Sequence, residues 1–165
     1  MRPIVLITAV ALATGCGTEA MSDSTLEGSI GSLGYTLDFD YLRITRSERE
    51  LVVRYVWETV LDNHQAVTNQ PVRLVVRPMD VDLVENQPIA MTMEVSLQHA
   101  VIALNQQSRQ LVDEPDFPKV RNGTLVFEEL GEQVGDPIRG TFDCMFVDGF
   151  TLLGDFQGEL STPPE

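Results

Sequence analysis

Two-residue alternation of apolar and polar side chains, from residue 138 to residue 160, is the feature that most constrains the fold of this chain. Phe142, Cys144 and Phe146 share one face of its first half. The second half follows the dipeptide Asp148-Gly149, and one of its faces carries Phe150, Leu152, Gly154, Phe156, Gly158 and Leu160. Such alternation is typical of strands that bury one face, and Asp-Gly is favoured in two-residue hairpin turns. We therefore expect an antiparallel hairpin with one wet and one dry face.

Each arm of this hairpin contains a glycine two positions before a phenylalanine. The two strings are Gly140-Thr141-Phe142 and Gly154-Asp155-Phe156. Glycine inside a strand permits close approach of another group or bending of the sheet. The pattern predicts close packing or curvature in the last third of the chain.

Shorter alternating segments precede the hairpin, at residues 35–41, 51–57, 72–77, 91–97 and 124–128. A short edge strand is expected at 81–83 and a long polar connection at 105–118. Residues 99–104 fit both a helical stripe and a bent strand, and we favour the strand. These seven or eight short strands predict an all-β fold over residues 34–162, either a single antiparallel β-sandwich or a small open barrel. The sequence does not separate the two architectures.

Both architectures bury the same bulky residues of the alternating segments. The predicted core consists of Tyr35, Leu37, Phe39, Leu51, Val53, Tyr55, Trp57, Val95, Phe127, Phe142, Phe146, Leu152 and Phe156.

Composition limits the partners that such a domain can have. The chain has 165 residues, 43 % hydrophobic and 22 % charged, which suits one globular domain. Its 11 basic and 25 acidic residues give a formal net charge of −14. Such a surface repels phosphate backbones and anionic lipid headgroups, so nucleic acid is not an expected partner.

The start of the chain has the pattern of a processing signal. Arg2 precedes an uncharged apolar run at residues 4–13, which is too short to span a bilayer but suits a secretory signal. The run ends at Leu-Ala-Thr-Gly-Cys, residues 12–16. This stretch resembles the lipobox of bacterial lipoproteins, although Ala13 stands where that family usually has leucine or another branched residue. The resemblance implies cleavage before Cys16 and attachment of lipid, such as palmitate, at Cys16.

A lipoprotein of this kind divides into three parts. Residues 1–15 are the signal peptide, residues 16–33 hold the lipidated cysteine and a flexible tether, and residues 34–162 form the β domain. Gly17, where some lipoproteins carry an Asp, implies an outer-membrane location facing the periplasm or the cell surface. The protein is then anchored to the membrane without spanning it. Cys144 is the one other cysteine, so no intrachain disulfide is expected.

Residues 117–160, with Phe117-Pro118 at the start and Gly-x-Phe strings inside, resemble the C-terminal part of small uncharacterised β-rich lipoproteins of myxobacteria and related bacteria. The resemblance implies a β-rich fold and an envelope location. It implies no activity.

Residues suited to catalysis do not form a recognisable group. His64 and His99 are the only histidines, and neither has the spacing of a zinc site. The nucleophile pattern Gly-x-Ser-x-Gly does not occur. Cys144 lies between two phenylalanines on the predicted inner face, where a thiol is buried and inert. We therefore predict no enzyme activity and no catalytic residue.

Two pairs of aspartates raise the question of calcium. Asp38 with Asp40, and Asp80 with Asp82, lie two residues apart, about 7 Å along a strand. Calcium takes six to eight oxygen ligands, usually from one loop, so we interpret both pairs as solvated faces and expect no metal. Asn122-Gly123-Thr124 matches a glycosylation sequon, and we interpret it as a turn.

An anchor, a tether and a β domain together favour a non-enzymatic envelope protein with a binding or structural role. It needs no cofactor, and its partner is expected to be an envelope protein or glycan. In the alternative, the domain encloses a small apolar ligand against inward residues such as Met91, Met93, Gly154 and Gly158. A cavity lined by these residues favours the carrier, whereas methionines that fill gaps in a closed core favour the binding module.

Overall fold

Ten strands form one sheet in the computed structural model of the chain, which describes residues 23–30, 37–60, 66–79, 81–91, 95–105, 108–113 and 117–162. In chain order they are β1 (Leu26–Gly28), β2 (Tyr41–Arg46), β3 (Leu51–Val60), β4 (Ala66–Val76), β5 (Pro88–Ala90), β6 (Val95–Asn105), β7 (Ser108–Asp113), β8 (Val120–Leu130), β9 (Pro137–Phe146) and β10 (Thr151–Ser161). The predicted all-β fold is confirmed, and the described residues contain no helix. Accordingly, no described helix is long and apolar enough to cross a membrane.

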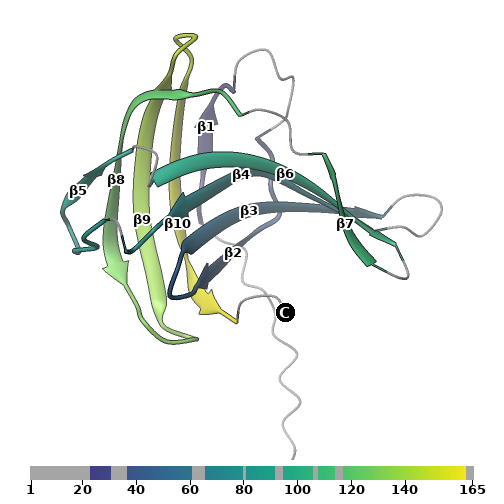
Figure 1. Cartoon of the computed structure of the whole chain (residues 1–165), viewed down its shortest axis with the longest axis horizontal. Helices are drawn as coiled ribbons and strands as arrows, with labels where there is room; N and C mark the ends of the chain where they lie inside the picture. Colours follow the sequence, from purple (N-terminus) through teal and green to yellow (C-terminus); the bar gives the residue numbers. More distant parts are fainter. Residues whose placement is uncertain are drawn as a thin grey trace, which may run out of the picture.

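The sheet folds over on itself, so that its two halves face each other across the core (Figure 1). The strand order is β5-β8-β9-β10-β2-β3-β4-β6-β7, and β1 pairs with β10 outside this path. We call β1, β5, β8, β9 and β10 sheet A, and β2, β3, β4, β6 and β7 sheet B. Neighbouring strands are antiparallel except β10 and β2, which are parallel and place Leu160 opposite Ile44. This parallel pair joins the two sheets.

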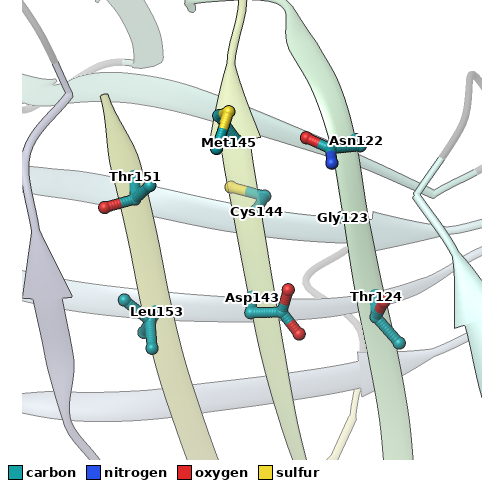
Figure 2. A pocket seen from close by; sticks show the side chains of 8 residues that line it. All are labelled: Asn122, Gly123, Thr124, Asp143, Cys144, Met145, Thr151 and Leu153. Atoms are coloured by element: carbon teal, nitrogen blue, oxygen red, sulfur yellow. The ribbon is translucent and has the colours of Figure 1, made fainter. Parts of the chain in front are cut away.

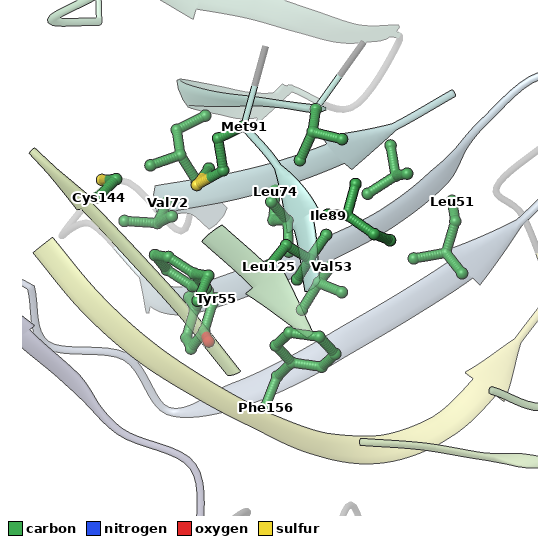
Figure 3. Close-up of a cluster of buried hydrophobic side chains, with 14 of the residues drawn as sticks. Leu51, Val53, Tyr55, Val72, Leu74, Ile89, Met91, Leu125, Cys144 and Phe156 are labelled. Atoms are coloured by element: carbon green, nitrogen blue, oxygen red, sulfur yellow. The ribbon is translucent and has the colours of Figure 1, made fainter. Parts of the chain in front are cut away.

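The core lies between sheets A and B, where the inward residues of both meet (Figure 3). Aromatic rings pack edge to face there: Phe127 and Phe156 have ring centroids 5.7 Å apart, and Tyr55 and Phe142 6.4 Å apart. Nine predicted core residues are buried, namely Leu51, Val53, Tyr55, Val95, Phe127, Phe142, Phe146, Leu152 and Phe156. Leu37 and Phe39 are partly buried against the core, and Tyr35 lies outside the described residues.

Trp57 was predicted in the core, and this prediction is wrong, because its side chain is 39 % exposed. A register shift in the β3–β4 pairing falls between Tyr55 and Trp57. Residues 51–56 are buried apart from half-buried Arg54, whereas Trp57 and Glu58 are both exposed, so the packed part of β3 ends before Trp57. Figure 1 shows β3 and β4 extending past the strands of sheet A.

The two Gly-x-Phe strings interlock across the β9–β10 pair. Gly154 is paired with Phe142, and Phe156 with Gly140. A methyl group at Gly140 would lie 2.6 Å from the ring of Phe156, and one at Gly154 would overlap the ring of Phe142. Each ring thus occupies the space that its glycine partner leaves, as predicted from the sequence.

The predicted tether at residues 16–33 includes a part that is not free. Within it, Leu26–Gly28 forms β1 and pairs with residues 152–154 of β10. Both carboxylate oxygens of Asp155 accept hydrogen bonds from Thr25, from the backbone N–H at 2.6 Å and from the hydroxyl at 2.9 Å. The Ser24 hydroxyl accepts one from the Gln157 N–H at 2.9 Å. The folded domain therefore begins at about Ser24 and not at residue 34.

Three further expectations need correction. Residues 108–113 of the predicted polar connection form strand β7, which pairs with β6. The short edge strand is Pro88–Ala90, and residues 81–83 are not a strand. The β9–β10 connection is longer than a two-residue turn: it comprises the four residues 147–150, the Phe146 N–H donates to the Phe150 carbonyl across it, and Gly149 adopts φ +90°. Phe150 consequently lies at the rim and is 47 % exposed.

Candidate functional site

An open groove of about 400 Å³ lies on the outer face of sheet A, across β8, β9 and β10 (Figure 2). Two cross-strand rows line it. The first row is Asn122, Met145 and Thr151, and the second is Thr124, Asp143 and Leu153. Because side chains alternate along each strand, both rows point away from the core. The groove is therefore a surface site whose floor is the hydrogen-bonded backbone of β8, β9 and β10.

The strand β1 extends the second row at the edge of β10. Glu27 pairs with Leu153, and the Ser29 N–H donates to the Thr151 carbonyl at 3.0 Å. The row then reads Thr124, Asp143, Leu153 and Glu27. It combines two carboxylates with an apolar side chain between them, so the groove favours a partner with apolar and basic groups.

Large apolar side chains are exposed in and beside the groove. Within it, Met145 is 37 % and Leu153 50 % exposed. At the β9–β10 connection, Val147 is 66 % and Phe150 47 % exposed. We call these four residues the hairpin patch. Clustered apolar side chains with a polar rim are typical of interaction surfaces, whereas single ones are ordinary.

On the inner side of sheet A, core side chains pack directly behind the groove. Cys144 points inward between the two rows, opposite Gly123. A methyl group at Gly123 would lie 2.8 Å from Met91 Sδ, so the methionine fills the space under the glycine. Burial raises the pKa of the Cys144 thiol to about 11, which keeps it protonated at neutral pH. The thiol is therefore buried, as predicted, and its burial disfavours the reactive thiolate form.

No family model, curated protein or solved structure matches the chain.

Several predicted site residues lie outside the described residues: Cys16, His64, Asp80 and Met93. His99 belongs to β6. Asp38 and Asp40 precede β2, and the carboxylate of Asp40 accepts a hydrogen bond from the Glu58 N–H at 2.9 Å. Within the described ranges, no three metal-ligating side chains form a group. The sequon residues 122–124 lie inside strand β8 and do not form a turn.

The residues named for an apolar cavity are packed where the structure describes them. Met91 is 7 % exposed and fills the space under Gly123. The ring of Phe142 occupies the space at Gly154, and a methyl group at Gly158 would lie 3.2 Å from Ile44. At these positions the interior is filled by side chains.

Sequence reasoning missed Met145 and Leu153 as surface features. Both occupy wet-face positions of the alternating pattern, where a large apolar side chain interrupts the polar series. The dipeptide Leu152-Leu153 carries this signal, since only one of two neighbouring strand residues can face the core. An apolar residue out of phase on two adjacent strands would have indicated the groove.

Proposed function

We propose that this protein is a lipid-anchored envelope lipoprotein that acts as a non-enzymatic binding module through the groove of sheet A. The single observation that carries the proposal is the exposure of Met145 and Leu153 on the outer face of sheet A, within a groove with polar lining. Exposed apolar side chains of this size need a partner surface to be removed from water.

The position of the first folded residues supports an anchored orientation. Residues 24–29 run along β10 beside the groove, because β1 pairs with residues 152–154. An acyl group at Cys16 would be only eight residues from Ser24, where docking begins. Attachment at this side favours a partner in or near the same membrane. The mixed acidic and apolar lining favours an envelope protein over an anionic glycan.

The carrier alternative has less support. It requires an internal cavity next to Met91, Gly154 and Gly158, and all three positions are packed against other side chains. Methionine in such a place serves as a gap filler. We therefore prefer binding on the outside of the sheet to binding within it.

The anchor is tested by metabolic labelling with palmitate. We expect label in the wild-type chain and none in Cys16→Ser, which should also leave the membrane fraction or remain unprocessed. Absence of label in the wild type would contradict the lipoprotein assignment and would leave the groove untouched.

The groove is tested by crosslinking in intact cells and identification of the captured proteins. Leu153→Glu and Met145→Glu should lose a specific crosslinked partner at unchanged protein level. Val134→Glu is the matched control, because Val134 is 66 % exposed but belongs to the β8–β9 connection. Equal capture by all three variants would reject the groove as the binding surface.

A further inference from the structure

Three arginines lie directly opposite one another on the outer face of sheet B. Arg43 of β2 pairs with Arg54 of β3, and Arg54 pairs with Arg73 of β4. Paired residues on neighbouring strands point to the same side, about 4.8 Å apart. Their neighbours Ile44, Val53 and Leu74 belong to the core, so the three guanidinium groups face outward. We call Arg43, Arg54 and Arg73 the arginine row.

The arginine row stands out against the charge of the whole chain. Within residues 43–77 there are six basic residues and four acidic ones, although the chain as a whole carries 11 and 25. The six are Arg43, Arg46, Arg49, Arg54, Arg73 and Arg77, and the four are Glu48, Glu50, Glu58 and Asp62. Positive charge is thus concentrated on this part of an acidic protein.

Among the described residues, no salt bridge neutralises the row. Like charges directly opposite each other on a sheet are destabilising. The carboxylate of Glu50 acts on Arg54 through its charge, without forming a salt bridge to it. Arg54 Nη1 donates to the Thr45 hydroxyl at 2.7 Å, whereas Arg73 Nε is buried and has no hydrogen-bond partner.

Burial lowers the pKa of Arg54 to about 10, and the neighbouring charge of Arg73 is the next cause. Arg54 remains charged at neutral pH, and like charges directly opposite each other on the sheet are held there at a cost in free energy. A bound anion would remove that cost and would give Arg73 Nε a partner.

We propose that the arginine row binds a small phosphorylated ligand. A guanidinium fork matches the geometry of carboxylate and phosphate alike, but three forks side by side require more than one negative charge. A phosphate monoester supplies about −1.5 to −2 charges and three acceptor oxygens in one group. The net charge of −14 opposes approach to an extended anionic surface, which favours a small soluble ligand over a lipid headgroup in a membrane.

The test uses the full chain with Cys16→Ser, so that no acyl chain contributes to binding. Inorganic phosphate and pyrophosphate are titrated in chloride buffer of low ionic strength by isothermal calorimetry. We expect saturable binding that is tighter for pyrophosphate. Arg54→Gln and Arg73→Gln should each weaken it about tenfold or more, since each removes a charge-assisted hydrogen bond to the anion.

Two controls make the outcome decisive. Arg139→Gln removes an arginine of sheet A that is already paired with Glu128 at 2.8 Å, and it should leave binding unchanged. Arg43→Gln tests the row again if either of the other variants fails to fold by circular dichroism. No saturable binding by the folded wild type would overturn the proposal, and so would equal weakening by Arg139→Gln. Binding to phosphatidylglycerol vesicles is measured with the same variants. If Arg54→Gln and Arg73→Gln lost vesicle binding while their pyrophosphate binding stayed unchanged, the row would be assigned to a membrane surface and the small-ligand proposal would be overturned.

Discussion

Sheets A and B differ in how their residues are buried along each strand. In β9 of sheet A, burial alternates without exception from exposed Pro137 to buried Phe146. In β3 of sheet B, Val52 and Val53 are both buried, and so are Tyr55 and Val56. Val52, Val56 and Val75 are buried outside the core cluster, which places them on the outer face. Sheet A therefore has one dry face and an open groove, whereas on sheet B the valines beside the half-exposed arginine row are buried on the outer face as well.

This difference concerns what each outer face contributes to stability. In sheet A the inner face holds the fold together, and the outer face carries the open groove. In sheet B the outer face also contributes to stability, and charged side chains on it are held among buried neighbours. Substitutions should reveal the contrast, because the same change has different effects on the two outer faces.

The largest loss of stability is expected for a substitution on the inner face of sheet A. Phe156→Ala removes a ring that is 1 % exposed and that packs on Phe127 and over Gly140. We expect a loss of about 3 to 5 kcal/mol in the free energy of unfolding. Urea denaturation measures it, with Phe150→Ala as the exposed control. A loss equal to that of the control would contradict the packing described for sheet A.

A smaller loss of stability is expected when a methyl group is placed at one of the glycines that face a phenylalanine ring. Gly154→Ala places a methyl group into the ring of Phe142 and should cost about 1 to 3 kcal/mol. Gly158→Ala is the matched control, because its methyl group would meet only the flexible end of Ile44 at 3.2 Å. Thermal unfolding of both variants decides the point. Equal midpoints would show that the glycines are not needed for close packing.

Burial on the outer face of sheet B predicts a cost that the outer face of sheet A does not have. Val52→Ala removes two buried carbon atoms, which corresponds to about 1.5 kcal/mol at about 0.8 kcal/mol per methylene group. Leu153→Ala, at a side chain on the outer face of sheet A that is 50 % exposed, should cost less, about 0.5 kcal/mol. The two outer faces would be equivalent if both variants behaved alike.

The smallest effect concerns the edge of sheet A, where β1 docks. Asp155→Ala removes the acceptor of both Thr25 hydrogen bonds and should cost about 1 kcal/mol, since these groups are exposed to water. Hydrogen exchange at residues 24–29 should accelerate while exchange in β9 stays unchanged. Glu159→Ala, on the same strand, is the control. Unchanged exchange at residues 24–29 would mean that Asp155 does not hold this segment.

The sequence predicted sheet A better than sheet B for physical reasons. A strand that is buried on one face alternates apolar and polar residues with a period of two. Residues 137–161 show this alternation almost without interruption. Val52 and Val53 show no such period, because both faces of β3 are buried there. The tether prediction failed at Leu26–Gly28, whose pairing depends on Asp155, more than a hundred residues away.

The two candidate binding features were also outside the reach of the sequence. Arg43, Arg54 and Arg73 are unremarkable as single residues, and only the pairing register of three strands aligns them. Met145 and Leu153 left a visible signal, because each is apolar at a wet-face position. Their meeting in one groove again follows from the register of β9 and β10.

Thiol accessibility tests the contrast between the two outer faces most directly. In the Cys16→Ser chain, Leu153→Cys and Val52→Cys are treated separately with a maleimide under native conditions. Cys144 remains in place as an internal slow reference, because it is 3 % exposed and its pKa is raised to about 11. We predict that the thiol at position 153 reacts at the rate of a free thiol and that the thiol at position 52 reacts as slowly as Cys144. Similar rates at positions 153 and 52 in folded protein would contradict an open face on sheet A and a covered face on sheet B.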